Sequence, residues 1–295
     1  MAATTSAVLP TRRRARVNTR KLVENGAAWI ALAFFVVIAV FPVFWMFMTS
    51  VKADRDLVNP STIPFWFQQP LTLDHYVYLF TATKFTTWLG NTFLISSCVV
   101  LITLVVCIPA AYALARLKFI GAEHIGIGVF LSYVVPPTIL FLPLAQILAG
   151  HGLYNTKWGL VVVYPTFTIP FCLWLLAGFF RTVPLEIEEA ALVDGCNRWQ
   201  AVVRVVLPLS LAGIMTVAIF AFTLAMQEFV YALTFVSSST EKPVTLGIPT
   251  DLIRGDVYFW GSLMAGALLA GIPVAILYNF FLDYFVEGIT GGALK

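Results

Sequence analysis

Six runs of mainly apolar residues determine what this chain can fold into. They cover residues 27–49, 89–114, 125–149, 159–180, 210–236 and 257–283. A helix needs about 20 such residues to cross the hydrocarbon layer of a membrane, and every run reaches that length. Only 11% of the 295 residues are charged, against about 25% in an ordinary soluble domain, so no stretch is left for a separate soluble core. The sequence predicts an all-α polytopic membrane protein with six transmembrane helices.

The positions of the basic residues predict how the chain is oriented. An even number of spans puts both termini on one side, and with that side cytoplasmic, 12 of the 18 Lys and Arg residues face the cytoplasm. We therefore expect a basic cytoplasmic segment over 1–26, a transmembrane domain over 27–283 that includes a cytoplasmic loop at 181–209, and a cytoplasmic tail over 284–295. The cluster between Arg12 and Arg16 is explained by this topology rather than by nucleic-acid binding.

The cytoplasmic loop is the longest polar passage in the second half of the chain, and its first part predicts a short helix. Pro184 suits a first helical position, three glutamates follow in the first turns, and Gly195 is a typical stop. Ala190 and Ala191 would give this helix a surface of small side chains that another protein can approach closely. The surrounding glutamates and Asp194 are expected to supply charges at its edge.

A second helix is expected from Asn197 to just before Pro208. Its apolar residues recur with helical spacing and predict one stripe that rests on the ends of the membrane helices. The stripe consists of Trp199, Val202, Val203 and Val206.

The segment EEAALVDGCNRWQAVVRVVLPL resembles the EAA loop of permease subunits in binding-protein-dependent ABC importers. The matching residues are Glu189, Ala190, Ala191, Asp194, Gly195 and the closing Leu207 and Pro208. The segments LGNTFLIS, TIPFCLWLLAGFF, QEFVYALTF and DYFVEGITGGALK are similar to the carbohydrate-uptake branch, most closely to its maltose-type six-span permease. One departure is Met226-Gln227, where that branch often has Trp-Asn.

The resemblance implies a transmembrane domain like that of type I ABC importers, in the plasma membrane of a bacterium or archaeon. Its partners would be a second related permease, two ATP-binding cassette subunits and an extracytoplasmic solute-binding protein, which loop 237–257 could contact. The cargo would be a di- or oligosaccharide, with glycerol-3-phosphate or a polyol as the alternative. ATPase coupling is assigned by this resemblance to Glu188, Glu189, Ala190, Ala191, Asp194 and Gly195.

The sequence has no G-x-x-x-x-G-K-[ST] phosphate loop, so we expect ATP and Mg to be bound by partner chains and no cofactor by this one. His75, His124 and His151 lack metal-ligand spacing, so neither a catalytic nor a metal site is predicted, and the chain is not expected to be an enzyme. An ATP-independent secondary transporter is the alternative from another class. It is disfavoured because such proteins keep ion ligands near the midplane, where this chain has almost no acid.

Gln227 and Glu228 are the candidates for a transport pathway. Glu228 is the one ionisable residue well inside an apolar run, but the helical rise places it roughly 27 Å from the inner start of that run, near the outer interface. Both a pathway role and a solvated helix end are therefore open. Several aromatic residues are equally open between packing and sugar binding, namely Trp45, Phe167, Trp174, Phe222 and Tyr231.

Overall fold

The structure is a computed structural model that describes residues 19–61, 65–117 and 119–293. Its helices confirm the all-α fold, and the strands of the described part are Ile253–Arg254 (β1) and Val257–Tyr258 (β2). The chain divides into two units, Met1–Met46 and Phe47–Lys295. The predicted domain limits at residues 26 and 283 stay predictions, and the basic cluster from Arg12 to Arg16 lies outside the described residues.

The first unit is formed by most of helix α1 (Thr19–Ser50), which contains Pro42. Its apolar side chains are exposed around the whole helix, for example Trp29, Phe35 and Ile38. A helix that is hydrophobic on all sides requires lipid or another apolar surface around it. It therefore fits the first predicted span, and residues Asn25–Ser50 are long and apolar enough to cross a membrane.

The second unit contains three further helices that can each cross a membrane. They are α4 (Phe85–Arg116), the α7–α8 pair (Lys157–Val163 and Pro165–Thr182) that forms one span, and α15 (Trp260–Ala293). Helix α15 continues into the segment that was predicted to be a C-terminal tail.

Neither the third nor the fifth apolar run forms a single straight helix. The third run is divided into α5 (Ala122–Val134) and α6 (Pro137–Gly150), which meet at 96°. The break falls at Pro136-Pro137, because a residue before proline avoids the helical conformation and proline donates no backbone hydrogen bond. Counting each bent pair as one span gives up to six candidate spans in the described residues, the predicted number, although the second pair begins at Arg198 inside the predicted loop 181–209.

A bend of 76° near Ser210 separates the fifth run from the helical segment that precedes it, and the run itself is broken near Glu228. Its main helix is α12 (Leu211–Gln227), and the short α13 (Val230–Phe235) follows the break. The helices before the first bend are α10 (Arg198–Ala201), a π-helix η1 (Val202–Val206) and α11 (Leu207–Leu209).

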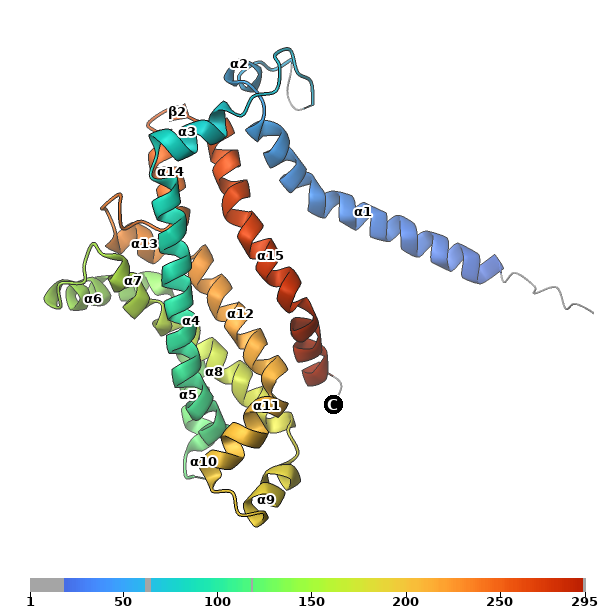
Figure 1. Ribbon diagram of the computed structural model, residues 1–295, viewed down its shortest axis with the longest axis vertical. Helices are drawn as coiled ribbons and strands as arrows, with labels where there is room; N and C mark the ends of the chain where they lie inside the picture. The colour runs from blue at the N-terminus through green and yellow to red at the C-terminus, as the bar shows by residue number, and fades with distance from the viewer. Residues whose placement is uncertain (1–18, 62–64, 118, 294–295) are drawn as a thin grey trace, which may run out of the picture. The chain divides into compact units, whose positions relative to one another are not determined.

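Helix α4 lies at the centre of the second unit and packs most extensively against α8 and α12 (Figure 1). Figure 1 shows α9 (Leu185–Val193) and α10 at one end of this unit, and α3 (Asp74–Ala82), α14 (Val244–Leu252) and β2 at the opposite end. The short α2 (Asp54–Leu57) precedes α3 in the chain. We call these two the α9 end and the α14 end.

Candidate functional site

The turn after α9 is built around Gly195. Its φ is +92°, in the left-handed region that favours glycine, and a Cβ atom at this position would meet no atom within 4 Å. The backbone N–H groups of Asp194, Gly195 and Cys196 donate to carbonyls of the last turn of α9, at 2.9, 3.2 and 3.0 Å. The predicted first helix and its glycine stop are confirmed, and the glycine is required by the backbone rather than by crowding.

The next helix begins with a capping box at Asn197. Its side chain accepts from Gln200 N at 2.8 Å, and the Gln200 side chain accepts from Asn197 N at 2.9 Å. These two hydrogen bonds hold the first turn of α10 in one orientation relative to the turn after α9.

The predicted apolar stripe of this second helix was half wrong. Val202 and Val206 are buried as expected, but Val203 and Trp199 are exposed, the latter to 70%. The reason is the π-helix η1, which bonds each residue to the fifth one before it and so breaks the 3.6-residue period on which the stripe was based. The helix also continues past the predicted end, through Pro208 to Leu209.

The outer surface of α9 combines small, acidic and apolar side chains. Glu189, Ala190, Asp194 and Gly195 are exposed, and Ala191 is half-buried. The apolar side chain of Val193 is 87% exposed on the same loop. Exposed apolar groups of this kind gathered at one end of a protein are typical of a surface that binds a partner.

Glu188 differs from the expectation that the glutamates of α9 lie at an exposed edge, because its side chain is buried and only 5% of the residue is exposed. The Tyr112 hydroxyl donates to Glu188 Oε1, and Arg116 Nε lies 3.5 Å from Glu188 Oε2. Arg116 Nη2 also donates to the carbonyl of Val183 at 2.5 Å. Tyr112 and Arg116 are four residues apart near the end of α4, so Glu188 ties α9 to that helix.

The two candidate pathway residues lie where α12 ends. Gln227 is the last residue of α12 and is exposed, and Glu228 is half-buried. The Glu228 carboxylate accepts backbone hydrogen bonds from Tyr231 at 2.8 Å and Ala232 at 3.1 Å. A carboxylate at the start of a helix satisfies N–H groups that have no partner within the helix. Glu228 therefore has a structural role in starting α13, and its pathway role stays a prediction.

The burial of the aromatic candidates separates them. Tyr231 and Phe222 are buried, and the Phe167 ring packs 6.0 Å from the Tyr231 ring, which favours packing over sugar binding for these three. Trp45 belongs to the first unit. Trp174, on α8, is 56% exposed.

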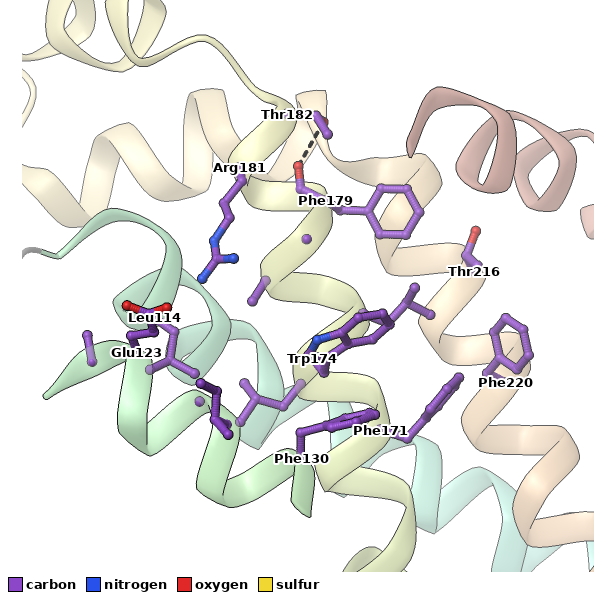
Figure 2. Close-up of a pocket in the computed structure, with 17 residues that line it drawn as sticks. Leu114, Glu123, Phe130, Phe171, Trp174, Phe179, Arg181, Thr182, Thr216 and Phe220 are labelled. Atoms are coloured by element: carbon purple, nitrogen blue, oxygen red, sulfur yellow. Dashed lines mark hydrogen bonds between the residues drawn. The ribbon is translucent and has the colours of Figure 1, made fainter. Parts of the chain in front are cut away.

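Trp174 lines a cavity of about 600 Å³ that is bounded by α5, α8, α12 and the end of α4 (Figure 2). Figure 2 shows the rings of Phe130, Phe171 and Trp174 gathered at one side and the charged groups of Glu123 and Arg181 at another. Aromatic faces combined with a few hydrogen-bonding groups can bind a ligand that has both apolar and hydroxyl surfaces. These residues share no sequence motif, because they come from distant segments of the chain.

Among the residues that the structure describes, no three His, Cys, Asp or Glu side chains are grouped so that they could hold a metal ion. His75 instead lies in the α14 end, where its Nε2 is 2.8 Å from the carbonyl oxygen of Lys52.

Comparison with known proteins gives consistent matches over most of the chain. The family model described as "Binding-protein-dependent transport system inner membrane component" matches residues 107–291. The trehalose/maltose transport system permease protein MalG of Thermococcus litoralis is 32% identical over 285 residues, which are 96% of this chain and 99% of that protein. The diacetylchitobiose uptake system permease protein DasC of Streptomyces coelicolor is 33% identical over 257 residues, 87% of this chain and 92% of that protein.

Among solved structures, the crystal structure of a bacterial ABC transporter involved in the import of the acidic polysaccharide alginate is similar. The TM-score is 0.77 at 19% identity, and the match covers 92% of this chain and 99% of that one. At 19% identity this structural similarity supports the fold alone. The family assignment rests on the sequence matches.

Proposed function

The chain belongs to the inner membrane components of binding-protein-dependent transport systems, and on that premise we propose that it moves a di- or oligosaccharide inward, driven by ATPase subunits that bind α9. As a permease of the carbohydrate-uptake type it is a multi-pass plasma membrane protein and not itself an enzyme.

The observation that carries the proposal is the surface of α9. Its exposed Glu189, Ala190 and Val193 stand on a helix whose end is fixed by Gly195 and whose other side is tied to α4 through Glu188. A rigid helix with a small-residue face is suited to a groove on another protein. Since the chain has no phosphate loop, ATP and Mg would be bound by two such partner subunits. A second, related permease would complete the membrane part.

We assign the α9 end to the cytoplasm and the α14 end to the outer side. This places the loop 181–209 with Arg181, Arg198 and Arg204 inside. The assignment agrees with the topology that puts most of the Lys and Arg residues of the chain on the cytoplasmic side. At the other end, segment 239–244 is held against α4 by hydrogen bonds, whereas the β1–β2 hairpin is exposed. Of loop 237–257, the hairpin is therefore the part that could contact a solute-binding protein.

Two features support a sugar as cargo. The relatives named above transport trehalose or maltose and diacetylchitobiose by their names. The cavity beside Trp174 offers an exposed indole ring together with Arg181 and Glu123, a combination that suits the C–H faces and hydroxyls of a sugar. We place the cavity on the cargo path, with Gln227 and Glu228 as further candidates. Glycerol-3-phosphate and polyols remain the competing cargoes.

Purification of the chain from its native membrane tests the proposal directly. We expect an ATP-binding subunit and a second permease to co-purify, and the ATPase rate of this complex in lipid vesicles to rise when the solute-binding protein is supplied with its sugar. A panel of maltose, trehalose, a chitobiose derivative, glycerol-3-phosphate and a polyol then identifies the cargo. Uptake by the purified single chain along an ion gradient, with no ATPase present, would instead establish a secondary transporter.

Replacing Trp174 with alanine tests the cargo path. We expect uptake at saturating loaded binding protein to fall about 2- to 10-fold, since an aromatic contact contributes roughly 0.5–1.5 kcal/mol beyond the area that it buries. Trp158→Ala is the matched control, because Trp158 is similarly exposed but does not line the cavity. Equal losses in the two variants, or none in either, would remove the cavity from the path.

A further inference from the structure

Helix α4 is tied to its surroundings by buried polar side chains at both of its ends. Near the α9 end, Tyr112 and Arg116 hold Glu188 of α9 and the carbonyl of Val183. The side chains of Arg116 and Glu188 are 7% and 6% exposed. Separating such a buried pair leaves charges without partners, which is costly, so α9 and the end of α4 are expected to move together.

Near the α14 end, α4 holds the segment that joins α13 to α14. Trp88 Nε1 donates to the carbonyl of Ser239 at 2.7 Å. Asn91 Nδ2 donates to the carbonyls of Thr240 and Lys242 at 2.8 and 3.0 Å. This segment of backbone therefore follows any displacement of α4, because its carbonyls would otherwise lose buried partners.

A third contact fixes the start of α14. The backbone N–H of Val244 donates to Thr92 Oγ1 at 2.7 Å, and Thr92 Oγ1 donates to the carbonyl of Trp88 at 2.9 Å. In addition, Lys157 Nζ donates to Asn91 Oδ1 at 3.2 Å, which joins the start of α7 to the same cluster. The tie at the α14 end is thus a network and not a single bond.

Helix α4 continues from one tied end to the other, with 32 residues in all, and contains Pro109 in its inner half. Its middle part makes a side-chain hydrogen bond between Thr103 and Thr168 of α8 at 2.8 Å, and otherwise packs mainly through apolar side chains such as Val99 and Ala111. Apolar packing has no fixed partners and tolerates small shifts better than buried polar bonds do. The arrangement is one continuous helix with specific bonds near its two ends.

We propose that α4 transmits movement between the outer segment 239–244 and the ATPase-binding helix α9, and that Glu188 is the positioning residue that latches α9 to it. The inference rests on the proposed function, because it assumes that α9 meets an ATPase and that the α14 end faces the solute-binding protein. It assigns to Glu188 a role different from direct contact with the ATPase. Binding outside and hydrolysis inside would then be linked through one helix.

The test uses the complete complex in lipid vesicles and measures two quantities: the factor by which loaded binding protein stimulates the ATPase, and the sugar taken up per ATP hydrolysed. We expect Glu188→Gln to lower both at least fivefold. Tyr112→Phe, which removes one hydroxyl and leaves the Glu188–Arg116 pair, should lower them in the same direction and covers the case in which the first variant fails to assemble.

Asn91→Leu should have the same effect from the opposite end of α4, since it removes the donors to Thr240 and Lys242. The combination of Asn91→Leu with Tyr112→Phe should be no worse than the more severe single variant, because both interrupt one route. Thr103→Val is the control, since it removes a buried hydrogen bond from the middle of α4 and should leave the uptake per ATP unchanged.

Additive effects at the two ends, an equal loss in Thr103→Val, or unchanged coupling in Tyr112→Phe and Asn91→Leu would overturn the inference. Charge reversal at Glu189 distinguishes a failure of the inference about α4 from a failure of the proposed function. If that reversal uncouples the complex and the α4 variants do not, only the role of α4 is wrong. If no ATPase subunit accompanies the chain, the proposed function itself fails.

Discussion

Glu189→Arg should reduce sugar uptake by the assembled complex more than tenfold while the chain still inserts and assembles. The side chain is exposed on α9 beside Ala190, so folding does not depend on it. In the proposed contact with an ATPase, the reversal replaces an acidic group by a basic one. Losing one partner of a charged pair at an interface costs about 2–5 kcal/mol, which corresponds to a factor above ten. Uptake into vesicles and ATPase rate, measured together, give the result.

Asp74→Arg is the charge-matched control for this prediction. Asp74 is also exposed and also lies on a short helix, but at the α14 end. It should retain most of the uptake. A similar loss in both variants would show that the effect comes from net charge, and a Glu189→Arg complex with normal uptake would remove Glu189 from the ATPase contact.

Gly247→Ala should lower the melting temperature of the purified protein by roughly 6–12 °C, corresponding to about 3 kcal/mol. A Cβ atom at Gly247 would lie 2.3 Å from the ring of Trp88. That ring has no room to move, because Trp88 is fully buried and its indole N–H is bonded to the carbonyl of Ser239. The added methyl group must therefore displace α14 from α4.

Gly128→Ala provides the comparison, because its Cβ atom would meet nothing within 4 Å on helix α5. We expect an unchanged or slightly higher melting temperature, since alanine is favoured over glycine inside a helix by about 0.5–1 kcal/mol. Equal melting temperatures for the two variants would mean that the α4–α14 contact is looser than the structure shows.

Local signals in the sequence were sufficient to predict α9 and the turn that ends it. The acidic first turn, the glycine stop and the length of α9 depend on residues within one or two turns of each other, and each was predicted. The π-helix η1 was not, because five consecutive residues of ordinary helical propensity give no warning of a change in hydrogen-bond period.

The inward direction of Glu188 could not be predicted either, although part of the signal was present. Ala191 and Leu192, three and four residues later, are half-buried, so this side of α9 faces the protein. The partner of Glu188 could not be identified from the sequence, because Tyr112 is 76 residues away along the chain. The cavity beside Trp174 could not be predicted for the same reason, since its walls come from four separate helices.

The hydrophobic runs predicted where helices lie but not whether they are straight. The bend at Pro136 has a local cause that the sequence displays. The break at Glu228 has none, because the residues around it are compatible with a helix, and it is stabilised by bonds from the Glu228 carboxylate to the next helix. Tertiary structure, which residue propensities do not describe, decides such positions.

The spacing of the tied residues on α4 has a consequence for the lipid in which this protein can work. Asn91 and Tyr112 are 21 positions apart, which amounts to roughly 32 Å along a helix axis, close to the thickness of about 30 Å of a bilayer's hydrocarbon layer. In the proposed orientation both attachment points would lie near the headgroups, and α4 would have little freedom to tilt when acyl chains are longer or shorter. If α4 transmits movement as proposed, transmission should depend on how well the membrane thickness matches this spacing.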